Sequence, residues 1–221
     1  MKPPISFKGL AGLLLAIVVG YSVGLLIQQY KPLGIDVSAN HTARALLENT
    51  ELVYDGPADA DLQVIAFTDY QCGACRISAP RLTAAAEKDG AVRVAYRNWP
   101  IFGELSEEAT RIVLAANRQG LLLKLHHALM EERRGMQPAV VREVAENVGV
   151  DWAQLQKDLI TYQAEIDAEI AHAGAEAFAL NLPGTPAYLI GQKLVVGGMN
   201  ESQFRRVFAS ARKAARKASA S

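Results

Sequence analysis

Cysteine is scarce in this chain, whose 221 residues include only Cys72 and Cys75. Two cysteines cannot build the disulfide scaffold of a small secreted domain, and they cannot form a four-cysteine zinc site. The sequence also lacks a second cysteine pair, a methionine cluster and a histidine pair at the i, i+4 spacing that chelates a metal, one of which a closed copper or zinc shell would need beside two thiolates. We therefore predict no metal site.

An excess of charge of either sign is also missing. Lysine and arginine number 23, aspartate and glutamate number 23, and the formal net charge is zero. A nucleic-acid-binding domain usually carries a basic excess, so we expect no nucleic-acid partner. Hydrophobic residues make up 50% of the chain, which is enough for a sizeable core and argues against global disorder.

Charged residues are absent from Leu10 to Ile27, a stretch close to the length of a transmembrane helix. Two lysines precede it, so the positive-inside rule places residues 1–9 in the cytoplasm. We predict that residues 10–27 cross the lipid bilayer of a bacterial inner membrane once and hold a periplasmic or otherwise extracytoplasmic domain. A cleaved signal peptide ending near Ser22-Val23-Gly24 is the alternative, and it exports the same domain.

The rest of the sequence predicts an α/β domain. The apolar, β-branched run from Leu62 to Thr68 is typical of a strand buried on both faces. With the helix and strand that follow, it forms a βαβ unit around the two cysteines. Helical patterns then fill about 104–181 before a β-hairpin and a last helix. Removing that insertion leaves a thioredoxin-like core.

The predicted elements share ordinary lengths and clear turn signals at their ends. They are a tether with a short helix over 28–49, strands over 51–54, 62–68 and 92–96, helices over 77–88, 105–118, 121–134, 137–148 and 151–180, a hairpin of 186–190 with 194–196, and a last helix after Asn200. We place the domain at 50–217 and a tail at 218–221. The fold class is therefore a thioredoxin-like fold with an inserted helical domain, preceded by an N-terminal membrane-anchor helix.

The two cysteines stand at CxxC spacing where a strand ends and a helix begins. The helix N-terminus favours negative charge and so favours the thiolate of Cys72, which is the reactive form of a thiol. Cys75, one turn later, lies on the same face of the helix and can close a disulfide with Cys72. We predict that Cys72 is the more exposed, attacking thiol, and that Cys75 faces the core and resolves the mixed disulfide. An inert structural disulfide is the alternative, but so short a loop contributes little stability.

Two further features flank the cysteine pair. Asp69 precedes it and is interpreted first as a turn-forming or capping residue, with a proton relay to Cys75 as the alternative. In Gly184-Thr185-Pro186, base rates for X-Pro bonds predict a trans peptide and a proline that opens an edge strand. The functional alternative is a cis-proline loop in which Thr185 offers main-chain groups to a substrate. The adjacent His126 and His127 are interpreted as ordinary helix residues.

Three segments resemble the DsbA-like thiol–disulfide oxidoreductases. They are Phe67–Arg76 around the cysteines, Arg97–Gly103 after the next strand, and Leu182–Tyr188 at the proline loop. The resemblance runs from about Ala58 to Val207. It implies that Cys72 is the nucleophile and Cys75 its partner, that Pro186 is cis and preceded by Thr185, and that a redox-active disulfide replaces any cofactor.

The resemblance also implies an activity. The chain would exchange disulfides with exported polypeptides, and a membrane redox partner would re-oxidise it. The dipeptide Gly73-Ala74 departs from the histidine-containing motif of strong oxidases, so a membrane-tethered reductase or isomerase stays open beside the oxidase. Because the segment before the domain is too short for a dimerisation module, we expect a monomer. A CxxC metal-binding chaperone is the remaining alternative.

Overall fold

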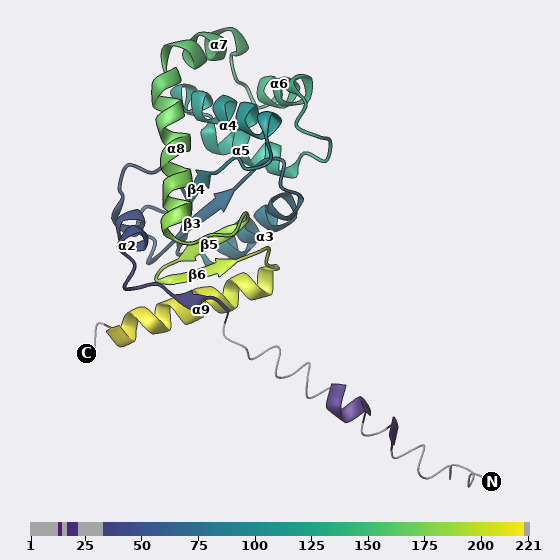
Figure 1. The fold of residues 1–221 in the computed structure, drawn as a ribbon, viewed down its shortest axis with the longest axis vertical. Coiled ribbons are helices and arrows are strands. Elements are labelled where there is room, and N and C mark those ends of the chain that lie inside the picture. Colours follow the sequence, from purple (N-terminus) through teal and green to yellow (C-terminus); the bar gives the residue numbers. More distant parts are fainter. Residues whose placement is uncertain (1–12, 15–16, 22–32, 219–221) are drawn as a thin grey trace, which may run out of the picture. The chain divides into compact units, whose positions relative to one another are not determined.

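The structure is a computed structural model that describes residues 13–14, 17–21 and 33–218. The chain divides into two compact units, Met1–Leu33 and Gly34–Ser221. The second unit contains all the elements discussed below (Figure 1).

A single mixed sheet organises the second unit. In the described part of the chain its strand order is β1-β6-β5-β3-β4-β2, and β3 pairs in parallel with β4 and antiparallel with β5. Because β3 lies between these neighbours, its apolar run is buried on both faces, as its composition predicts. The strands are β1 Ile35–Asp36, β2 Tyr54–Asp55, β3 Leu62–Thr68, β4 Val92–Asn98, β5 Ala187–Ile190 and β6 Lys193–Val196.

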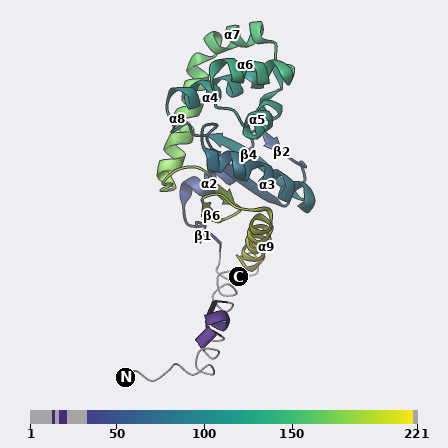
Figure 2. The same ribbon diagram turned by 90° about the vertical axis from the view of Figure 1, so that its right-hand side faces the viewer.

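Helices cover both faces of the sheet and one of its ends. On one face, Ala43 and Leu46 of α2 and Ala177 of α8 pack against Ile65 and Phe67 of β3. Helices α3 and α9 pack together on the other face. In Figures 1 and 2, α4–α7 gather at the end of the sheet that lies away from α9. The helices are α2 His41–Glu48, α3 Gly73–Asp89, α4 Glu104–Ala116, α5 Leu122–Glu131, α6 Pro138–Asn147, α7 Trp152–Thr161, α8 Gln163–Ala179 and α9 Glu201–Ala218, with a 3₁₀ turn at Asn117–Gln119.

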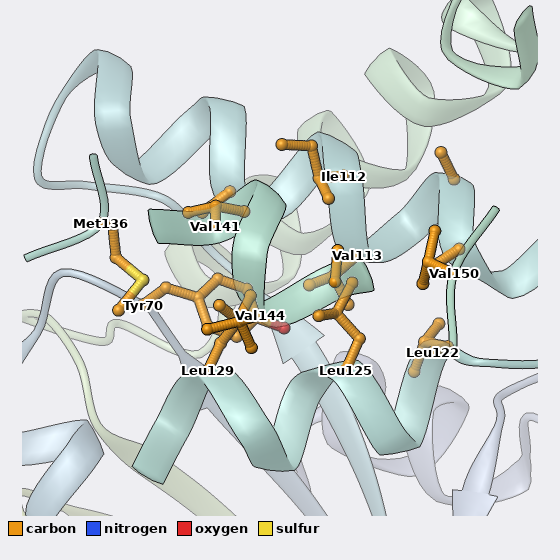
Figure 3. Close-up of a cluster of buried hydrophobic side chains, with 14 of the residues drawn as sticks. Tyr70, Ile112, Val113, Leu122, Leu125, Leu129, Met136, Val141, Val144 and Val150 are labelled. Atoms are coloured by element: carbon orange, nitrogen blue, oxygen red, sulfur yellow. The ribbon is translucent and has the colours of Figure 1, made fainter. Parts of the chain in front are cut away.

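The inserted helices have their own core, and one residue of the cysteine loop enters it. Tyr70 is fully buried and packs with Leu125, Leu129 and Met136. Figure 3 shows its ring lying among the side chains of these helices, close to Val144. The segment just before the cysteines is therefore fixed by the insertion as well as by the sheet.

Most predicted elements are present, with differences at their ends. The strand predicted over 51–54 is reduced to Tyr54–Asp55, and the helix predicted over 151–180 is two helices that meet at Tyr162. The segment predicted as a tether joins the fold, because Ile35 pairs with Leu194 and α2 packs on the sheet. Helix α3 begins at Gly73, four residues earlier than predicted, since Cys72 caps it.

The predicted anchor at 10–27 lies largely outside the described residues. Residues 13–14 and 17–21 of this stretch are helical. Within the residues that the structure describes, no helix has both the length and the hydropathy needed to cross a bilayer. Most of the predicted tail at 218–221 also lies outside the described residues.

Candidate functional site

The two cysteines lie at the carboxyl end of the central strand. A turn after β3 is held by Asp69, whose carboxylate accepts from the Gln71 N–H at 2.7 Å and whose carbonyl accepts from the Cys72 N–H at 3.2 Å. Cys72 then has extended backbone and is the N-cap of α3. Its sulfur accepts a hydrogen bond from the Cys75 N–H at 3.1 Å, which is the position of a capping oxygen in most helices.

Both cysteines are free thiols and both are buried. Cys72 is 3% exposed and Cys75 is 1% exposed. The predicted order of exposure is present, but the difference is small because the proline loop covers the first sulfur. The Cys72 thiol lies 3.4 Å from the carbonyl oxygen of Thr185 and donates to it.

The surroundings of the two thiols lower the pKa of Cys72 and raise the pKa of Cys75. The hydrogen bond from the Cys75 side chain, with smaller contributions from the Thr185 side chain and the Cys75 N–H, lowers the pKa of Cys72 to about 6. The same hydrogen bond to Cys72, together with burial, raises the pKa of Cys75. Near neutral pH the pair therefore holds one thiolate, at Cys72, and one thiol, at Cys75. This is the arrangement that a nucleophile and its resolving partner need.

The proline loop has the less common peptide geometry. The Thr185–Pro186 bond is cis, as the family resemblance implies and contrary to the base-rate prediction of trans. The edge-strand interpretation is wrong, because β5 begins at Ala187 and lies between β6 and β3. Thr185 thus lies directly against Cys72, while the Pro186 carbonyl accepts from the Gly197 N–H at 2.8 Å.

Asp69 is fully buried and serves as an anchor for the neighbouring loop. Besides Gln71, its carboxylate accepts from the backbone N–H groups of Ile101, at 2.6 Å, and Phe102, at 3.2 Å, and from the Ser106 hydroxyl. None of the hydrogen bonds within the described residues joins this carboxylate to Cys75. The geometry favours the turn-forming interpretation, and the relay stays a prediction.

An apolar surface borders the site. The loop that Asp69 holds carries Ile101 and Phe102, whose side chains are 40% and 54% exposed. On α3, two residues after Cys75, Ile77 is 60% exposed. Exposed apolar side chains beside a reactive thiol are suited to contact with an unfolded polypeptide.

His126 is not the ordinary helix residue that the sequence predicts. It is buried, its Nδ1 lies 2.9 Å from the Tyr70 hydroxyl, and its ring stacks on Tyr96 with centroids 3.8 Å apart. Burial, with a smaller effect of His127, lowers the pKa of His126 well below its usual value, so the ring is neutral. No local pattern reveals this, because its partners lie 30 or more positions earlier in the chain.

His127 faces the other way, toward Asp55, whose carboxylate lies 2.8 Å from its Nε2. The described residues hold no cluster of three or more histidine, cysteine, aspartate or glutamate side chains placed to bind a metal ion.

The chain is similar to known proteins in sequence and in fold. The family model described as "DSBA-like thioredoxin domain" matches residues 63–209. The chain is 34% identical to a thioredoxin-like oxidoreductase from Silicibacter pomeroyi, over 79% of this chain and 98% of that one, with a TM-score of 0.72. It is 25% identical to a periplasmic thioredoxin-like protein from Salmonella enterica serovar Typhimurium, over 79% and 96%, with a TM-score of 0.67. A "Probable disulfide bond formation protein D" from Bacillus anthracis is 23% identical and covers 80% of this chain and 83% of its own length.

Proposed function

The chain belongs to the DsbA-like thiol–disulfide oxidoreductase family, and from that premise we propose that it donates disulfides to exported polypeptides through Cys72 and Cys75. The observation that carries this proposal is the position of Cys72 at the N-terminus of α3, where its sulfur accepts the Cys75 N–H, an arrangement that favours the thiolate. A couple whose reduced form is stabilised by a Cys72 thiolate is easier to reduce, and is therefore the better oxidant.

The exchange proceeds in two steps on this geometry. In disulfide donation a substrate thiolate attacks Cys72 of the oxidised protein and expels Cys75, and a second substrate thiolate then attacks the substrate sulfur of the mixed disulfide and expels Cys72. In the opposite direction the Cys72 thiolate attacks a substrate disulfide, and Cys75 then attacks Cys72 and expels the substrate thiolate. The Thr185 backbone beside Cys72 and the apolar surface of Ile101 and Phe102 are placed to hold the substrate chain. We expect the protein to act as a monomer and a membrane redox partner to re-oxidise it.

The location is part of the proposal. The described residues of the uncharged stretch expose large apolar side chains, with Leu13, Leu14, Ile17, Val18 and Val19 between 52% and 60% exposed. Side chains of this kind are buried in lipid when such a stretch anchors a protein. The similarity to a periplasmic protein supports the same placement of the catalytic domain outside the cytoplasm.

The reduction potential of the couple tests the direction of transfer. The unit from Gly34 onward would be equilibrated with glutathione and the thiols quantified. A value at the oxidising end, about −120 to −180 mV, is expected for a disulfide donor. A value near about −270 mV would contradict the oxidase and favour the reductase. Neither Gly73 nor Ala74 offers a side-chain donor to Cys72, so its lowered pKa depends on Cys75, with a smaller contribution from the Thr185 side chain.

Trapping tests the roles of the two sulfurs. In Cys75→Ala, Cys72 can form mixed disulfides that no resolving thiol can break, so the variant should accumulate covalent adducts with exported polypeptides in cells. The matched control is Cys72→Ala, in which the remaining thiol is the buried Cys75. Equal trapping by both variants would refute the proposed division of roles.

A further inference from the structure

A small cavity lies beneath the active-site helix, between Cys75 and His126. Its volume is about 10 Å³, and its walls come from β3, α3, β4, α5 and β5. Most of its lining is apolar. Thr68, Cys75 and His126 are lining residues with polar side chains, and the Thr68 hydroxyl also donates to the Met130 sulfur at 3.9 Å. A cavity of this size is at the lower limit for one water molecule, which also needs two to four polar partners.

The hydrogen bonds of His126, a lining residue of this cavity, leave one ring nitrogen unpaired. Nδ1 is engaged by the Tyr70 hydroxyl, and Tyr70 does not line the cavity. The atom Nε2 is buried and, among the described residues, has no hydrogen-bond partner. A buried, unpartnered polar atom is costly, so it calls for a water or a function.

The tautomer follows from counting the unpaired groups. If the Tyr70 hydroxyl donates to Nδ1, the single ring proton lies on Nε2, and one group is left unpaired. If Nδ1 donates instead, both the tyrosine proton and the Nε2 lone pair are left unpaired in a buried site. The first arrangement leaves fewer buried groups unpaired and makes Nε2–H a donor.

Burial keeps the His126 ring neutral, and the two phenols that face it supply no negative charge. The loop after β3 contributes Tyr70, β4 contributes Tyr96, and α5 itself contributes His127. Burial raises the pKa of Tyr70 well above its usual value, and burial likewise raises the pKa of Tyr96. Neither phenol therefore supplies a negative charge that would protonate the histidine.

We propose that His126 is a positioning residue for thiol–disulfide exchange: its Nε2–H, through one water held in this cavity with Thr68, hydrogen-bonds the Cys75 sulfur when that sulfur carries negative charge. The inference rests on the proposed function. When a thiolate attacks Cys72 of the oxidised protein, the new S–S bond forms and the Cys72–Cys75 bond breaks. The electron pair stays on Cys75, which then takes one proton from solvent, replacing the proton that the attacking thiol released.

A hydrogen bond to the Cys75 thiolate should affect the rates of exchange and not the equilibrium. The thiolate exists only near the transition state, since Cys75 is a disulfide sulfur before the step and a thiol after it. Losing the bond should therefore slow exchange equally in both directions and leave the reduction potential unchanged. Hydrogen bonds to charged groups are strong enough for a loss of about tenfold.

The test measures reduction of the oxidised full-length chain by glutathione, the reverse reaction with oxidised glutathione, and the potential. His126→Phe keeps a ring on Tyr96 but has no N–H, and it should lose about tenfold in both rates at constant potential. His126→Gln can place an amide N–H toward the water and should recover most of the rate. His127→Phe, the neighbour that binds Asp55 outside the cavity, should retain the wild-type rates.

Three results would overturn the inference. They are wild-type rates in His126→Phe, a change of potential that accounts for the change of rate, or equal losses in His126→Phe and His126→Gln. If His126→Phe does not fold, Thr68→Val removes another partner of the water, and unchanged rates in that variant would also refute it. A wild-type chain that does not react with glutathione at all would instead refute the proposed function.

Discussion

At the scale of single residues, the reactivity of Cys72 depends on its partner one helical turn away. The hydrogen bond from the Cys75 side chain is the largest cause of its lowered pKa, of about 6. Cys75→Ala should therefore raise the pKa of Cys72, although the backbone N–H of residue 75 will limit the rise. Ultraviolet absorbance of the thiolate, recorded against pH, measures it. An unchanged titration curve would show that the backbone alone stabilises the thiolate.

The same pKa predicts how the stability of the reduced protein depends on pH. The folded pKa of Cys72, about 6, lies below the ordinary thiol value of about 8.5. The unfolded chain thus holds one more proton between these values, and stability rises with pH across this window, by at most about 1.4 kcal/mol per unit. The contribution is lost as the pH falls through about 6.

The oxidised protein is the control for this prediction, because it has no thiol to titrate. Denaturant unfolding of both forms, from about pH 5 to about pH 8, isolates the effect as their difference. The pH range stops at about 8 because of Cys75, whose pKa is raised in the folded protein. Above that pH the Cys75 thiol ionises in the unfolded chain but stays protonated in the folded one, so stability falls as the pH rises. A difference that is constant with pH would contradict the prediction.

Asp69 allows the structural and the relay interpretations to be separated. Its buried carboxylate accepts from three backbone N–H groups and the Ser106 hydroxyl, so Asp69→Ala should destabilise the fold by roughly 3 kcal/mol. Ser106→Ala removes one donor and should cost about 1 kcal/mol. If Asp69 acts only as an anchor, both variants should keep the exchange rate per folded molecule. A loss of rate in Asp69→Ala with normal kinetics in Ser106→Ala would support the relay.

At the scale of elements, one buried arginine joins β4 to α8. Arg97 is 3% exposed and forms ion pairs with Glu176, at 2.7 Å, and with Glu169. Arg97→Met removes one charge and leaves the carboxylates without their partner, which should cost about 3 kcal/mol. The matched control is Arg111 of α4, which pairs with Asp167 of α8. Arg111 is half-exposed, so Arg111→Met should cost less than about 1 kcal/mol. Chemical denaturation measures both, and equal costs would contradict the argument.

The elements also show where sequence reasoning succeeds. Continuous apolar residues and turn signals are local, and they predict β3 over Leu62–Thr68 to the residue. The predicted helix ends are wrong in two places. A cysteine sulfur caps α3, which therefore begins earlier than predicted, and a break at Tyr162 divides one continuous helical pattern into two helices. The site shows the same division. The CxxC is visible in the sequence, whereas the stacking of His126 on Tyr96 and the burial of Tyr70 depend on contacts between distant segments.

At the scale of the whole molecule, the helical insertion supports the active site as well as covering it. Tyr70, two residues before Cys72, is buried in the core of the insertion (Figure 3). The same residue bonds His126, which lines the cavity beneath Cys75. The thioredoxin-like core supplies the cysteines and the proline loop, and the insertion supplies the side chains behind them.

Residues 10–27 should attach the whole chain to a membrane. With residues 10–27 intact, the chain should sediment with membranes, and Ile17→Lys should release it, because a charge at the centre of a span costs about 3 kcal/mol. The chain from Gly34 onward should be soluble and have the same reduction potential, since the cysteine site lies within that compact unit. Mass spectrometry of the exported protein distinguishes the alternatives. A mature chain that begins near Gly24 would contradict the anchor and establish a cleaved signal peptide, whereas an intact N-terminus on a membrane-bound chain supports the anchor.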